Sequence, residues 1–159
     1  MKKLLYAGLF AVSAALAVQA AEIGQLLPAM QLNDQFGRPH VLAPATKRIY
    51  FTHDMAGGKL LKAALGDKGQ ALLDAQQAVA ITDVSGMPSM IRNMMAMPAM
   101  KKRSYRIGID ESGKQAAGLP RQPDQVTVID LDQLKITAVK FAADEKSLKA
   151  LVQEEKLGQ

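Results

Sequence analysis

The stretch over residues 47–65, KRIYFTHDMAGGKLLKAAL, constrains the fold more than any other part of this chain. Its apolar run Ile49-Tyr50-Phe51 predicts a short buried strand, and the pair Gly57-Gly58 predicts a turn. Helix-forming residues follow, with apolar side chains four apart on one face. The apolar run at residues 78–84 then predicts a second buried, parallel strand. We therefore expect a β-α-β unit with a right-handed crossover, whose first turn lies where ligands collect in such sheets.

The other expected elements surround this unit. Turn residues between short apolar runs predict a β-hairpin or an extended arm in residues 22–42. A helix beginning near Pro88 is expected to end or kink before Pro98, because proline cannot continue the backbone hydrogen bonding of a helix. The remaining predictions are a helix at 70–77, a strand at 105–109, a helical turn at 115–119, an antiparallel hairpin at 125–131 and 135–141, and an amphipathic helix at 142–155.

The first twenty residues have the pattern of a secretory signal. Lys2 and Lys3 precede an uncharged apolar run over residues 4–18, and small residues stand at the positions that allow cleavage after Ala20. The run is shorter than the ~20 apolar residues that a membrane span needs, so we expect no stable membrane anchor after cleavage. A chain of 159 residues is long enough for one domain, which we place at residues 21–159 and expect in the periplasm or outside the cell.

Cysteine is absent from the chain, so thiol chemistry of any kind is excluded. The formal net charge of +5 is modest, and the densest basic cluster is Lys101-Lys102-Arg103 with Arg106. Such a cluster at a helix end is typical of a solvated cap that suits the helix dipole. No aromatic series accompanies these charges, so we expect no binding of nucleic acid.

The order of these elements resembles the thioredoxin fold, and three local matches resemble its peroxiredoxin and TlpA-like branch. The opening Gly24-x-x-x-Pro28 followed by LNDQFG at residues 32–37 is similar to the start of that branch. Residues 107–118 resemble its strand-Asp-turn-Gly insertion, and residues 123–132 resemble the segment that carries the fold's cis-proline. The layout is also similar to the YtfJ-like periplasmic proteins. The resemblance implies an α/β three-layer sandwich, with a mixed central sheet, an N-terminal β arm and flanking helices.

The departures from that pattern determine what the resemblance implies for activity. In the superfamily, the turn after the first core strand carries the redox cysteine, but here residues 52–59 read THDMAGGK. We therefore carry over the scaffold and not the thiol-disulfide or peroxidase activity. The candidate binding residues are those of this turn together with the proline beside it: His53, Asp54, Met55, Gly57, Gly58, Lys59 and Pro123.

Six methionines lie within fourteen residues, at positions 87, 90, 94, 95, 97 and 100. Met87, Met90, Met94 and Met97 have the spacing of one helix face, which favours packing on the sheet or on a protein partner. Thioethers also suit Cu(I). The alternative is therefore a copper(I) site, and its candidate ligands are His53, Met55, Met90, Met94 and Met97.

Two functions follow from these patterns. The first is an exported, redox-inactive thioredoxin-like domain, without a cofactor, that acts as a binding or accessory module for a periplasmic protein partner. The second is a carrier of Cu(I). A catalytic set is not recognisable, because Ser85, His53 and Asp83 stand in no nucleophile-elbow pattern, so the sequence favours a protein that is not an enzyme.

Overall fold

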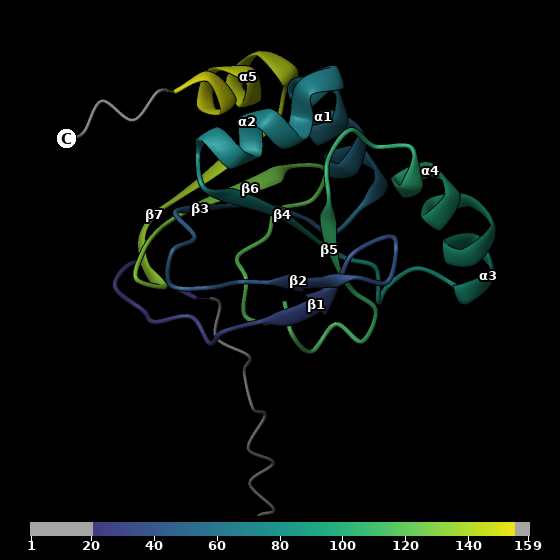
Figure 1. The fold of residues 1–159 in the computed structure, drawn as a ribbon, viewed down its shortest axis with the longest axis horizontal. Helices are drawn as coiled ribbons and strands as arrows, with labels where there is room; N and C mark the ends of the chain where they lie inside the picture. The colour runs from purple at the N-terminus through teal and green to yellow at the C-terminus, as the bar shows by residue number, and fades with distance from the viewer. Residues whose placement is uncertain (1–20, 155–159) are drawn as a thin grey trace, which may run out of the picture.

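A computed structural model of the chain describes residues 21–154 (Figure 1). The expected signal at residues 1–20 lies outside the described residues, as do residues 155–159. Seven strands form one mixed sheet with the order β2-β1-β5-β4-β3-β6-β7. The strands are β1 (Gln31–Asn33), β2 (Pro39–Val41), β3 (Arg48–Thr52), β4 (Ala78–Asp83), β5 (Ile107–Asp110), β6 (Val126–Asp132) and β7 (Lys135–Ala142).

The centre of the sheet is the predicted β-α-β unit extended by one strand. β3 pairs in parallel with β4 in the register Tyr50 to Ala80, and β4 pairs in parallel with β5. The hairpin of β6 and β7 joins β3 antiparallel at one side, and the hairpin of β1 and β2 joins β5 at the other. This arrangement confirms the predicted class, a mixed α/β sheet with an N-terminal β arm and flanking helices.

Helices cover one face of the sheet. They are α1 (Met55–Leu65), η1 (Gly66–Lys68), α2 (Gly69–Ala75) and α5 (Glu145–Gln153), and Figure 1 shows them together along one side of the strands. Leu61, Leu73 and Leu148 are buried from these helices against Tyr50 and Val128 of the sheet. Burial of this apolar surface is the main source of stability for this face, since the chain has no disulfide.

Extended and turn segments cover the opposite face. Ile49, Phe51 and Ile81 pack there against Leu27 and Leu119, which belong to no helix. The helical turn predicted at residues 115–119 is wrong, because this segment forms turns and bends. Its backbone is bonded by side chains instead, since the amide of Ala116 donates to Asp110 and its carbonyl accepts from Arg121. The third layer of the sandwich is therefore irregular.

The methionine-rich segment forms one helical stretch from residue 89 to residue 101, which we call the methionine helix. It begins as α3 (Ser89–Ile91), continues as the π-helix η2 (Arg92–Ala96) and ends as α4 (Met97–Lys101). Pro98 lies in the first turn of α4 and does not end the helix. The wider π turn before it changes the hydrogen-bond pattern where the proline ring would obstruct an α-helix. The expected kink is thus a change of helix type.

Candidate functional site

The turn predicted at Gly57-Gly58 is wrong, because both glycines lie within α1, and the chain turns two residues earlier, before Met55. Asp54 fixes this turn between β3 and α1. This residue is the N-cap of α1, and its Oδ1 accepts a hydrogen bond of 2.7 Å from the amide of Gly57. Its Oδ2 accepts a hydrogen bond of 2.8 Å from the amide of Asp124, in the loop before β6. Gly57 itself approaches the same loop so closely that a Cβ there would lie 2.9 Å from the carbonyl oxygen of Gln125. The start of α1 is therefore joined to the loop before β6.

His53 lies half-buried beside this cap. Its ring stacks on Phe51 with the centroids 6.2 Å apart, and its Nε2 lies 3.5 Å from Oδ2 of Asp54. Its Nδ1 is buried and has no hydrogen-bond partner within the described residues. Arg121 covers the same Phe51 ring, with its guanidinium carbon 5.0 Å from the centroid. These contacts hold the imidazole at one end of the site.

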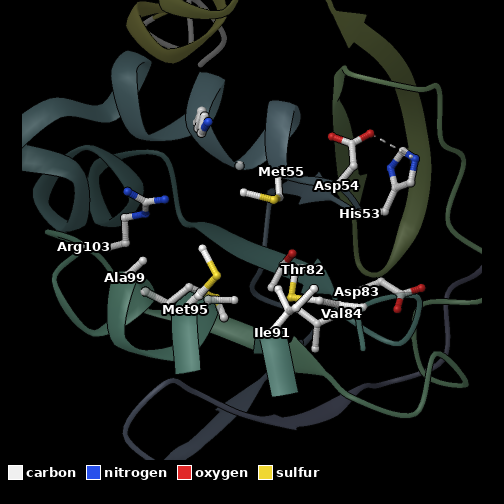
Figure 2. A pocket seen from close by; sticks show the side chains of 15 residues that line it. His53, Asp54, Met55, Thr82, Asp83, Val84, Ile91, Met95, Ala99 and Arg103 are labelled. Atoms are coloured by element: carbon white, nitrogen blue, oxygen red, sulfur yellow. Dashed lines mark ion pairs between the residues drawn. The ribbon is translucent and has the colours of Figure 1, made fainter. Parts of the chain in front are cut away.

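A cavity of about 250 Å³ lies between the start of α1 and the methionine helix. Figure 2 shows Met55 at one side of the cavity, with Met95 and Ile91 on the other and His53 and Asp54 at one edge. Arg103 stands at the opposite edge. The lining residues are His53, Asp54, Met55, Gly58, Lys59, Thr82, Asp83, Val84, Met87, Ile91, Met95, Ala96, Ala99, Met100 and Arg103.

Five of the seven predicted binding residues line this cavity, namely His53, Asp54, Met55, Gly58 and Lys59. Gly57 is buried behind them, where its amide completes the cap. Pro123 is exposed and does not line the cavity, and the described residues contain no cis peptide bond. The proline belongs to the site only through its neighbour Asp124, which bonds to Asp54.

The methionines divide differently from the sequence prediction. Met90 and Met94 are 71% and 72% exposed, so of the two predicted alternatives they do not pack on the sheet, and a face for a protein partner stays a prediction. Met97 packs against the core, and none of these three lines the cavity. Residues three and four apart share a face only in an α-helix, and the π-helix η2 breaks that phase. The methionines that line the cavity are Met55, Met87, Met95 and Met100.

Asp83 ends β4 at the edge of the cavity and is already fully engaged. Its Oδ1 accepts from the amide and the hydroxyl of Ser85, and its Oδ2 lies 3.0 Å from Nη1 of Arg121. Burial alone would raise the pKa of Asp83, but the hydrogen bonds from Ser85 and the charge of Arg121 hold it below the usual value. Because Ser85 bonds to Asp83, the structure describes no serine–histidine pair here.

Two residues of the site, Gln35 and Arg103, are not predicted as site residues by the sequence. Gln35 is buried, and its amide donates to the carbonyls of Met100 and Tyr105 while accepting from the amide of Ile107. It thereby joins the end of the methionine helix to the start of β5. Its partners lie 65 to 72 residues away in the chain, so no local sequence pattern indicates these contacts. Arg103 was interpreted as part of a solvated cap, but its side chain lines the cavity.

Most polar groups of the lining are already engaged within the protein. Within residues 21–154 no three histidine, aspartate or glutamate side chains stand close enough together to hold a metal ion. Both lining carboxylates are occupied by backbone or arginine hydrogen bonds. What the cavity offers is apolar and thioether surface, together with the cationic side chains of Lys59 and Arg103.

Comparisons with known proteins define the fold. No family model matches the chain, and no curated protein matches it. A solved structure described as a protein disulfide isomerase from Bacteroides thetaiotaomicron is 17% identical, with a TM-score of 0.58, covering 84% of this chain and 87% of the other. Peroxidoxin BcpB from Mycobacterium tuberculosis is 16% identical with a TM-score of 0.55, covering 83% and 96%.

A third structure, the exposed lipoprotein thioredoxin of Streptococcus pneumoniae, is 14% identical with a TM-score of 0.54, and the match covers 80% of this chain and 100% of the other. Likeness at such low identity defines the fold alone. The chain therefore has the thioredoxin-like fold, and its neighbours include proteins of the thiol-disulfide oxidoreductase type. It differs from a thiol enzyme in having no cysteine.

Proposed function

We propose that this protein is an exported, redox-inactive thioredoxin-like domain that acts as a binding or accessory module. The observation that supports this most is the cavity at the turn where the superfamily carries its redox cysteine. Here that turn presents Met55 to an apolar space and holds both of its polar neighbours in internal contacts. A site built this way suits binding through apolar contact and shape, and the chain has no cysteine for thiol-disulfide exchange.

The surface beside the cavity supports contact with a protein. Met90, Ile91, Met94 and Met95 are all exposed along the methionine helix, and a cluster of large apolar side chains on a surface is typical of an interaction site. Methionine side chains are flexible and polarisable, which suits a surface that adapts to its partner. The basic residues Lys101 and Lys102 follow at the end of the same helix.

Export to the periplasm or beyond rests on the signal pattern of residues 1–20. Within the described residues, no helix has the length and apolar character needed to cross a bilayer. The exposed lipoprotein thioredoxin of Streptococcus pneumoniae is an example of this fold outside the cytoplasm. Cleavage after Ala20 is tested by mass spectrometry of the protein from its native host.

The test of partner binding is photo-crosslinking from within the native host. A photoreactive residue replaces Met95 at the cavity, or Phe141 on β7 as a matched exposed apolar control. We expect discrete crosslinked products from position 95 that are absent from position 141. Only uncrosslinked monomer at position 95, or the same products from both positions, would contradict the proposal.

A second candidate, a soft-metal carrier, is favoured by one specific observation. Four thioether side chains, Met55, Met87, Met95 and Met100, line the same cavity as His53. Thioether and imidazole groups are suitable ligands for Cu(I). This set replaces the predicted Met90, Met94 and Met97, which do not reach the cavity.

The copper hypothesis is tested by titrating the protein with Cu(I) against a competing chelator. The hypothesis expects affinity to fall when Met95 is replaced by leucine or His53 by alanine, and to be unchanged by Met94→Leu. Leucine keeps the apolar volume and removes only the sulfur, so the pair of methionine variants separates coordination from packing. Equal affinity in all variants would rule out this site.

A further inference from the structure

The charged groups of the cavity stand at two separate edges. Asp54 and Asp83 lie at the edge nearest His53, where backbone amides and Arg121 already compensate them. Arg103 lies at the opposite edge (Figure 2), and Lys59 also lines the cavity. A ligand inside the cavity is therefore surrounded by apolar side chains and meets an uncompensated charge only of positive sign.

Arg103 is the unusual group of this set. Arg103 is half-buried as a residue, and within residues 21–154 its guanidinium makes no hydrogen bond, no ion pair and no contact with an aromatic face. Arg48, Arg106 and Arg121 each bond to a carboxylate. A guanidinium presents five donors, and Arg103 offers them at the cavity edge with no acceptor among the described residues. The position suits a carboxylate supplied by a ligand.

The interior suits an apolar tail. Val84, Ile91 and Met95 line the cavity, and a smaller pocket of about 40 Å³ adjoins it between Leu61 and Ile107. Arg103 and Met100 line both spaces. A volume of 250 Å³ accommodates about eight non-hydrogen atoms at roughly 30 Å³ each.

We propose that this cavity binds a carboxylate that carries an apolar tail of about six to eight carbons. The carboxylate pairs with Arg103, and the tail lies against Met55, Met95 and Ile91. This inference rests on the proposed binding function and specifies the chemistry of the ligand. The same chemistry is found in a free amphiphilic acid and in the C-terminal carboxylate of a polypeptide that ends in apolar residues.

The test uses the methionine methyl groups as reporters. In protein labelled with ¹³C at the methionine methyls, octanoate should shift the signals of Met55, Met87, Met95 and Met100 in a saturable way. The signals of exposed Met90 and Met94 should stay unchanged. Octanol is the neutral control of equal length, and it should bind about tenfold more weakly than octanoate. Octanoate should also bind about tenfold more weakly to the variant Arg103→Gln than to the unmodified protein. Acetyl-leucyl-leucine and its C-terminal amide are the corresponding pair of peptide probes. If the ligand is a polypeptide C-terminus, the acid should bind about tenfold more tightly than the amide.

Each outcome decides the proposal. Preference for octanoate alone assigns a free amphiphile, and preference for the dipeptide acid over its amide assigns a polypeptide terminus. Equal affinity of octanoate and octanol, with no effect of Arg103→Gln, overturns the carboxylate while leaving a binding cavity. No shift with any probe, or equal shifts at Met90 and Met94, overturns the cavity as a ligand site as well. The comparison of octanoate with octanol in the unmodified protein decides the question even if Arg103→Gln does not fold.

Discussion

Asp54 and Asp124 are joined by a hydrogen bond of 2.8 Å from the backbone amide of Asp124 to Oδ2 of Asp54. The other oxygen of Asp54 caps α1 through the amide of Gly57. One side chain therefore connects the start of the first helix to the loop before β6, seventy residues later in the chain. Asp54 itself lines the cavity, so the residue that joins these two segments also belongs to the candidate site.

Replacing Asp54 by alanine should lower the free energy of unfolding by about 2 kcal/mol, since an N-cap and a second hydrogen bond are each worth about 1 kcal/mol. Urea unfolding followed by circular dichroism measures this. The control is Asp144→Ala at the start of α5, where the carboxylate bonds only to Ser147 within its own helix. A loss at Asp144 equal to or larger than that at Asp54 would contradict the connecting role.

The adjacent glycines form a matched pair with opposite expected effects. A Cβ at Gly57 would lie 2.9 Å from the carbonyl oxygen of Gln125, whereas one at Gly58 would meet nothing within 4 Å. Gly58→Ala should therefore stabilise α1 by about 0.5–1 kcal/mol, because alanine favours the helix. Gly57→Ala should destabilise the protein, because backbone must move. The same sign of change for both variants in urea unfolding would show that α1 does not approach β6 as described.

Protonation of the buried Asp34 carboxylate should lower the stability of the protein in acid. Its side chain is fully shielded, and burial alone would raise its pKa, but hydrogen bonds from the amide of Arg38, the side chain of Arg106 and the amide of Phe36, with the charge of Arg38, lower it to about 2. The unfolded chain, with the ordinary value of 3.8, binds the proton first. Ionised Asp34 therefore contributes up to about 2 kcal/mol to the free energy of unfolding. This contribution is complete above pH 4 and is lost as the pH falls from about 4 to about 2.

The measurement compares unfolding free energies of the protein and of Asp34→Asn at several values of pH. The advantage of the unmodified protein over the variant should shrink steadily as the pH falls from 5 to 2.5. An advantage that stays constant over this interval would mean that the contacts of Asp34 with Arg106 and the hairpin amides do not depend on its charge.

Exposure predicts the order in which methionines oxidise. Met90, Met94 and Met95 are 71%, 72% and 62% exposed, whereas Met30 and Met100 are 2% and 8% exposed. Dilute hydrogen peroxide should therefore convert the first three to sulfoxides well before the last two. Peptide mass spectrometry over a time course gives the rates, and the same reaction in concentrated urea is the control, in which the rates should become similar. Early oxidation of Met100 in the folded protein would contradict its packing against the core.

The parts of the fold that could be predicted from sequence are those whose signals are local. The strands β3, β4 and β6 are rich in apolar and β-branched residues because they are buried in the sheet, and the turn residues before Gly37 mark the hairpin of β1 and β2. Five of the seven predicted binding residues line the cavity for the same reason, since they follow one strand directly.

The remainder depends on contacts between distant segments. Ala116 follows no helical pattern because Asp110 and Arg121 bond its backbone. The π-helix η2 changes the direction in which each methionine points, so a spacing rule based on α-helices does not predict which methionines line the cavity. Arg103 reads as an ordinary basic cap in sequence, and only the docking of its helix beside α1 brings it to the cavity.

The central claim is that the cavity between α1 and the methionine helix is the contact site of the protein. Crosslinking in the native host from a photoreactive residue at Met55, with and without Ala99→Trp, tests it most directly. Ala99 lines the cavity and is otherwise exposed, so tryptophan there should fill the space without disturbing the core. We predict discrete products from position 55 that disappear when Ala99→Trp is added, while circular dichroism shows an unchanged fold. The same products at the same yield in the filled variant would contradict the claim.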